Sequence, residues 1–182
     1  KIPILTAKES VSSAAAVALP KTSESPQLLK IRHSMSHVMA MAVQQLFPNA
    51  RVTIGPWTET GFYYDFDNPD PFTEADLKAI KKAMIKIINQ KLPLERVEVS
   101  RAEAETRIKA QNEPYKLEIL EGLQEPITLY TLGEQWWDLC AGPHVEHTGQ
   151  LNAKAFELED TLVVQRLMGG FNPSAAAFLA LT

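Results

Sequence analysis

The chain has 182 residues, of which 45% are hydrophobic and 22% charged, values that fit one ordinary globular core with short tails better than two large domains. Its net charge of −4 excludes a protein that coats nucleic acid through bulk positive charge, although a local basic face remains compatible with it. A single cysteine excludes an internal disulfide and favours a reducing compartment, and no stretch approaches the roughly 20 apolar residues of a membrane span.

The first part of the chain shows neither a helical nor a strand period. We expect residues 1–25 to be a linker or docking tail, because proline and serine are frequent around Pro20–Pro26. The chain begins with Lys1, and an alanine- and serine-rich opening over 10–17 is compatible with the end of a processed leader. We therefore expect the protein in the cytoplasm or in an organelle matrix (plastid or mitochondrion), with an organelle slightly favoured.

A long helix is predicted over residues 26–46. Ser25 can cap its start and Pro26 suits its first position. At about 100° per residue, His33 and His37 fall on the side opposite the apolar one, so both must face solvent or a cleft. The expected apolar side consists of Leu28, Ile31, Met35, Val38, Met39, Ala42 and Leu46.

Further helices and strands follow without regular alternation. Residues 51–66 are predicted to form a hairpin, and Thr73 with Asp76 forms a capping box that starts a helix to about residue 91. The other predicted elements are strands over 94–99, 127–132 and 135–139 and helices over 101–111 and 114–122. This mixture indicates an α+β fold, a mainly antiparallel sheet packed with helices.

The helix that starts after Thr73 carries a row of lysines on the side expected to face solvent: Lys78, Lys82 and Lys86, with Lys81 nearer the edge. A solvated lysine face explains this row. A weak track for RNA phosphates is the other interpretation, and the sequence alone leaves both open.

Two short stretches contain most of the residues suited to chemistry. His33 and His37 form an HxxxH motif, and Cys140 and His144 form a CxxxH motif a hundred residues later. The chain has only four histidines and one cysteine, so this concentration is unusual. If the two stretches meet in the fold, they make a polar site that can hold a metal ion or activate water.

Residues 30–160 resemble the editing domain of threonyl-tRNA synthetase and, more distantly, the editing domains of alanyl-tRNA synthetase. The matching stretches occur in the family's order and spacing: Ile31–His37, Ile54–Pro56, Gly61–Asp65, Glu113–Lys116 and Asp138–His144. The match stops near Asp160, where the sequence leading into the aminoacylation core does not follow. We therefore expect an editing domain over 26–160, a divergent C-terminal tail over 161–182, and no capacity to charge tRNA.

The resemblance implies a hydrolase that removes serine wrongly esterified to threonine tRNA, acting in trans on the aminoacylated 3′ end. By motif, it assigns positioning or activation of the attacking water to His33 and Lys116. It assigns the binding of the substrate to five further residues: His37, Tyr64, Asp138, Cys140 and His144. A site that binds threonine can discriminate against serine only through one methyl group, which contributes about 1–3 kcal/mol of binding free energy. A second site that excludes threonine by its size is therefore needed.

Two alternatives remain open at this point. The threonyl-like stretches imply a site without metal or other cofactor, whereas the alanyl branch binds zinc, here with His33, His37, Cys140 and His144 as ligands. The second alternative is a catalytically idle relative that serves as a structural subunit of a larger ribonucleoprotein or protein assembly, such as an organellar ribosome.

Overall fold

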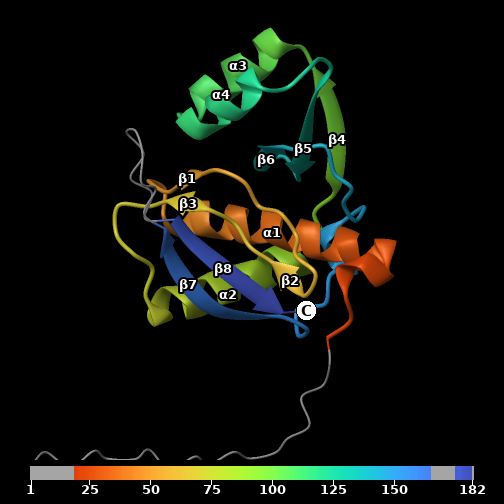
Figure 1. Ribbon diagram of the computed structural model, residues 1–182, viewed down its shortest axis with the longest axis vertical. Coiled ribbons are helices and arrows are strands. Elements are labelled where there is room, and N and C mark those ends of the chain that lie inside the picture. Colours follow the sequence, from red (N-terminus) through yellow and green to blue (C-terminus); the bar gives the residue numbers. More distant parts are fainter. Residues whose placement is uncertain (1–18, 165–174, 182) are drawn as a thin grey trace, which may run out of the picture.

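A computed structural model of the chain describes residues 19–164 and 175–181. Figure 1 shows the helix α1 (Pro26–Leu46) running between two parts of the molecule. Helix α2 (Glu74–Asn89) and one antiparallel sheet lie on one side, and a second, three-stranded sheet with two short helices lies on the other. The α+β architecture predicted from the sequence is confirmed. Every helix in the described part of the chain is too short or too polar to cross a bilayer.

Helix α1 begins as predicted, but its sides are not divided into an apolar and a polar one. The Ser25 hydroxyl accepts from the backbone N–H of Leu28 at 3.3 Å. Every residue from Ser34 to Val43 is buried, whereas Leu46, expected on the apolar side, is 42% exposed. The reason is the position of the helix, because a helix enclosed by two layers buries all of its faces. On the side that carries the histidines, His37 therefore faces protein, and His33 stays partly exposed.

The larger sheet is built from strands far apart in the sequence. Strand β1 (Arg51–Val52) pairs with β3 (Phe66–Asp67), which confirms the expected hairpin, but β2 (Gly61–Phe62) pairs with β8 (Ala175–Leu181). Strand β7 (Glu157–Val164) pairs with the other edge of β8. The boundary expected at residue 160 thus lies inside β7, and residues 175–181, expected in a tail, form a strand. A short apolar run without alternation does not reveal a strand by its period.

The smaller sheet follows the sequence-based prediction closely. Strands β4 (Leu94–Val99), β5 (Ile127–Leu132) and β6 (Trp136–Leu139) form an antiparallel sheet in chain order. Helices α3 (Arg101–Ala110) and α4 (Pro114–Glu121) belong to the same half of the molecule, and a separate apolar cluster joins them to this sheet. This half is therefore a compact unit with its own small core.

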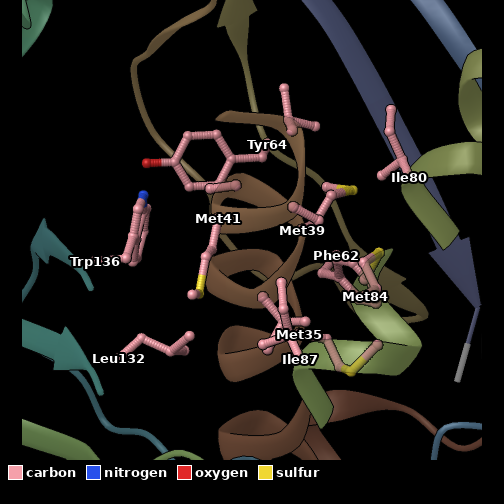
Figure 2. Close-up of a cluster of buried hydrophobic side chains, with 14 of the residues drawn as sticks. Met35, Met39, Met41, Phe62, Tyr64, Ile80, Met84, Ile87, Leu132 and Trp136 are labelled. Carbon is pink, nitrogen blue, oxygen red and sulfur yellow. The ribbon is translucent and has the colours of Figure 1, made fainter. Parts of the chain in front are cut away.

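The main core surrounds α1. Figure 2 shows methionines of α1 between side chains of α2 and side chains of the smaller sheet. The labelled members are Met35, Met39, Met41, Phe62, Tyr64, Ile80, Met84, Ile87, Leu132 and Trp136. Unbranched methionine fills the irregular space between two layers of different geometry. One continuous core therefore joins the smaller sheet to α1 and α2.

The segment before α1 is docked and not a free linker where the structure describes it. Residues Thr22–Glu24 form a short 3-10 helix, η1. The buried guanidinium of Arg32 donates to the Thr22 hydroxyl at 2.6 Å and to the carbonyls of Glu59 and Pro20 at 2.8 and 2.9 Å. Residues 20–24 are thus fastened to α1 and to the loop before β2.

A partly buried glutamine connects the two halves of the molecule. Gln44 of α1 donates to the carboxylate of Glu113 at 2.6 Å and accepts from the indole N–H of Trp136 at 2.7 Å. The same carboxylate accepts from the backbone N–H of Val52 at 3.0 Å. Because Glu113 precedes α4 and Trp136 begins β6, these bonds fix both elements against α1, next to the site described below.

Candidate active site at helix α1 and the loop after β6

The two chemically active stretches meet. His33 and His37 project from α1, and Cys140 and His144 come from the loop that follows β6. One ligand-type atom from each of the four lies within 4.8 Å of the others. The ring centroid of His144 is 4.2 Å from that of His33 and 4.3 Å from that of His37. The fold therefore produces the cluster that the spacing of the motifs allowed.

The loop turns back on itself to bring Cys140 and His144 together. Gly142 has a φ of 79°, a conformation open to glycine at little cost, and its N–H donates to the Cys140 sulfur at 3.2 Å. Two residues after the glycine, His144 is buried and points back toward α1. The neighbouring N–H of Val145 donates to the Ser34 hydroxyl at 3.0 Å, which ties the loop to the helix.

Hydrogen bonds orient the partly exposed His33 at the edge of the cluster. Its Nδ1 lies 3.2 Å from the carbonyl oxygen of Pro143, and a carbonyl can only accept, so Nδ1 carries the proton. In the neutral ring Nε2 then keeps its lone pair, and it lies 3.5 Å from the Cys140 sulfur. Pro143 and Ala141 are exposed beside it. His33 is therefore the histidine best placed to meet a reactant from solvent.

A buried charge network lies beneath the histidines. The Lys116 ammonium pairs with the Asp138 carboxylate, and both side chains are only 4% exposed. The other acceptors of the ammonium are the Thr53 carbonyl at 2.7 Å and the Tyr64 hydroxyl at 3.1 Å. Tyr64 in turn donates to Asp138 at 2.7 Å, and His37 Nε2 lies 3.5 Å from the same carboxylate. These contacts hold Asp138 at the base of the cluster.

Burial keeps the cluster uncharged. Desolvation lowers the pKa of His33 below the ordinary 6.5 and lowers those of His37 and His144 further. Desolvation also raises the pKa of the Cys140 thiol to about 12. At neutral pH the site therefore presents neutral imidazoles and a thiol, which can accept or relay protons, above one buried ion pair.

The four residues also fit a tetrahedral zinc ion. Zinc bonded to nitrogen and sulfur at about 2.0–2.3 Å separates its ligand atoms by about 3.5 Å. The Cys140 sulfur lies 3.5 Å from Nε2 of His33 and 3.3 Å from Nε2 of His144. The Pro143 carbonyl and the Ser34 hydroxyl hold the opposite nitrogens of these rings, as outer-shell groups do at zinc sites. The geometry thus allows the zinc alternative.

Two residues assigned to the site from the sequence lie deeper than expected. Tyr64 is fully buried, so its ring offers no open wall to a substrate, and its hydroxyl donates to Asp138. Lys116 is 3% exposed, and its three N–H groups have acceptors in Asp138, Thr53 and Tyr64. A fully bonded ammonium has no lone pair with which to take a proton, so this geometry favours an electrostatic role for Lys116 over that of a base.

Replacing Gly55 with alanine should destabilise the fold by about 1–3 kcal/mol, the usual cost of overpacking a core. A Cβ at Gly55 would overlap the ring of Tyr64, the residue that holds Asp138. The matched control is Gly122→Ala, because there the nearest atom is 3.7 Å away and φ is an ordinary −84°. Urea denaturation compares the two. Equal midpoints would contradict the close packing at Gly55.

The described fold contains the histidine–cysteine site in a region that is similar to a domain of aminoacyl-tRNA synthetases. Residues 127–166, which include β5, β6 and the site loop, match the family described as "Threonyl and Alanyl tRNA synthetase second additional domain". More particularly, the chain is similar to the editing domain of threonyl-tRNA synthetases, and over most of its length it matches part of proteins named threonine–tRNA ligase.

Two of the relatives are proteins named threonine–tRNA ligase. The chain is 86% identical to that of Parasynechococcus marenigrum over 160 residues, which cover 84% of this chain and 26% of the relative. It is 69% identical to that of Synechocystis sp. over 151 residues, which cover 83% of this chain and 25% of the relative. The chain therefore spans about a quarter of the length of these relatives.

Proposed function

We propose that the cluster around His33 hydrolyses the ester between serine and threonine tRNA. The observation that carries this proposal is the meeting of His33 and His37 with Cys140 and His144 in one partly open, uncharged site. The relatives' name, threonine–tRNA ligase, indicates the tRNA, and the resemblance to their editing region indicates the reaction. The partner is thus the aminoacylated 3′ end of tRNA, and the chain acts on it as a hydrolase.

In this mechanism His33 is the general base. A water molecule that takes the place of the Cys140 thiol hydrogen at Nε2 of His33 attacks the ester carbonyl carbon, and Nε2 takes the proton from the water. The bond between the carbonyl carbon and the ribose oxygen then breaks, and His33 returns the proton to that oxygen. Serine and free tRNA are released. An aminoacyl ester is already reactive, so positioning and modest acid–base help suffice.

The buried residues support this chemistry indirectly. The Lys116–Asp138 pair fixes the carboxylate beneath His37. The Cys140 thiol and His144 pack against His33 and limit the room beside it. A restricted space of this kind favours serine over threonine, because the additional methyl of threonine would meet these side chains.

We expect the purified chain to hydrolyse Ser-tRNA(Thr) much faster than Thr-tRNA(Thr). The expected discrimination is roughly 10- to 200-fold, the range that one methyl provides. Release of labelled amino acid from each aminoacyl-tRNA measures both rates, with protein-free incubation as the background. Equal rates would refute size exclusion. No hydrolysis of either ester would favour a non-catalytic role in a larger assembly.

We further propose that the reaction needs no metal, in line with the threonyl-like motifs. If zinc were bound, His33, His37, Cys140 and His144 would hold it, and it would supply Lewis-acid polarisation of the ester or of water. The expected result is protein that contains far less than one equivalent of zinc when purified without added metal, by elemental analysis. Deacylation should also survive a chelator. Stoichiometric zinc together with loss of activity on its removal would contradict this proposal.

A further inference from the structure

A buried serine next to His33 contacts the cluster from the helix side. Ser34 is fully buried in α1, and its hydroxyl oxygen lies 3.1 Å from Nδ1 of His144. The same oxygen accepts from the backbone N–H of Val145 at 3.0 Å. Ser34 therefore touches both the histidine of the loop and the backbone that carries it, although its side chain lies outside the four-residue cluster.

The hydrogen bonds of the site form a chain with one consistent direction. The direction of the first hydrogen bond is set by the Pro143 carbonyl. A carbonyl oxygen can only accept, so the ring proton of His33 is on Nδ1. Nε2 of a neutral His33 is then an acceptor, and the only hydrogen that Cys140 can offer it is the thiol proton, across 3.5 Å. The Cys140 sulfur already accepts from the Gly142 N–H at 3.2 Å, and its remaining lone pair can accept from a second donor.

The second half of the chain follows from the first. Nε2 of His144 lies 3.3 Å from the Cys140 sulfur and is the second donor to it if Nε2 carries the ring proton. Nδ1 of a neutral His144 then has only a lone pair, which requires a donor on its other side. The Ser34 hydroxyl is that donor, because its oxygen already accepts from Val145 and its own hydrogen is free to point at Nδ1.

We propose that Ser34 is a positioning residue of the site, whose hydroxyl donates to Nδ1 of His144 and so fixes the His144 ring with its proton on Nε2, facing the Cys140 thiol. With His144 donating to the sulfur, the Cys140 S–H points toward Nε2 of His33. The lone pair of His33, the proposed base, then stays on Nε2. The hydrogen-bond pattern stands on the geometry alone. Its importance for catalysis rests on the proposed hydrolase function.

This arrangement also distinguishes the site from a zinc site built of the same residues. A metal bound through Nε2 of His144 needs the lone pair on that atom, so Nδ1 would carry the proton and donate to Ser34. The two situations thus place the His144 proton on opposite nitrogens. Locating that proton tests the proposal directly.

The experiment is nuclear magnetic resonance of the full chain with ¹⁵N-labelled histidine, near neutral pH and in the presence of a chelator. Correlations between ring nitrogens and carbon-bound ring protons identify the protonated nitrogen of each of the four histidines. We compare the wild type with Ser34→Ala, with Ser34→Thr, which keeps a hydroxyl, and with Ser36→Ala. Ser36 is an equally buried serine of α1, and its hydroxyl lies 2.7 Å from each of the carbonyl oxygens of His33 and Gly55.

In the wild type, His144 should carry its proton on Nε2 and His33 on Nδ1. Ser34→Ala should remove the fixed tautomer of His144, Ser34→Thr should restore it, and Ser36→Ala should leave it unchanged. The kcat for Ser-tRNA hydrolysis should fall roughly 10- to 100-fold in Ser34→Ala, as for the loss of other outer-shell partners, with KM unchanged.

A proton on Nδ1 of His144 in the wild type would overturn the proposal, and so would an unchanged tautomer in Ser34→Ala. The wild-type measurement decides even if Ser34→Ala does not fold. If the expected tautomers are found but the wild type does not hydrolyse Ser-tRNA, the positioning by Ser34 stands and the proposed function fails.

Discussion

Replacing Lys116 with methionine should lower the free energy of unfolding by about 3–5 kcal/mol, the usual cost of breaking a buried ion pair from one side. The substitution keeps the length of the side chain but leaves the Asp138 carboxylate, which is 4% exposed, without its cation. It also removes a donor from the Thr53 carbonyl and the Tyr64 hydroxyl. Urea denaturation followed by circular dichroism measures the loss.

Lys109→Met is the matched control for this prediction. Lys109 also pairs with a carboxylate, Glu105, but the two side chains are 61% and 45% exposed. Such a pair four residues apart on a helix contributes at most about 0.5 kcal/mol. Changing Asp138 to asparagine in the Lys116→Met background should recover part of the stability, because it removes the uncompensated charge. Equal losses for Lys116→Met and Lys109→Met would contradict the buried pair.

Replacing His33 with alanine should lower kcat for Ser-tRNA hydrolysis by roughly 10²–10⁴-fold, the range for loss of a general base. The loss should come with little change in stability, because His33 is only partly buried and lies at the edge of the cluster. His33→Ala therefore differs from Lys116→Met, which should lower both the stability of the fold and the activity. Single-turnover deacylation and urea denaturation of the same preparations make the comparison.

His147→Ala is the control for His33→Ala, since His147 is the one histidine of the chain outside the four-residue cluster. It should retain the wild-type kcat. Full activity in His33→Ala would remove His33 from the mechanism and leave the attacking water without the proposed base.

The pH dependence follows from the same histidine. Burial lowers the pKa of His33 below 6.5, and only the neutral ring can take a proton from water. The value of kcat/KM should therefore be constant near neutral pH and fall as the pH drops through that lowered pKa, with a midpoint below 6.5. A midpoint above 6.5 would contradict the assignment. The profile is measured with Ser-tRNA at constant ionic strength.

Most local structure was predictable because it depends on neighbours in the sequence. The caps at Ser25, Thr73 and Ser100 start helices where expected. The lysines Lys78, Lys82 and Lys86 are exposed on α2, as their spacing predicted, although a role in binding RNA stays a prediction. Hydrophobic period and capping are local properties, so no tertiary information was needed for them.

Other features depended on contacts that no local pattern encodes. The burial of Lys116 was missed, because its Asp138 partner lies 22 positions away in the sequence and its Thr53 acceptor 63. Ser34 was missed as well, since a serine in a helix carries no signal until the loop with His144 is placed against it. The strand at 175–181 was missed because its partners lie at 61–67 and 157–164.

The sequence by itself determined which residues are available for chemistry, the helix and strands that carry them, and the similarity to threonyl-tRNA synthetase editing domains. Only the tertiary structure decided that His33 lies at the partly exposed edge of the cluster, that Lys116 is buried beneath the histidines, and that Ser34 contacts His144. The physical reason is the enclosure of α1 between two layers. Burial and the direction of hydrogen bonds belong to the packed molecule, because each depends on groups brought together from distant parts of the chain.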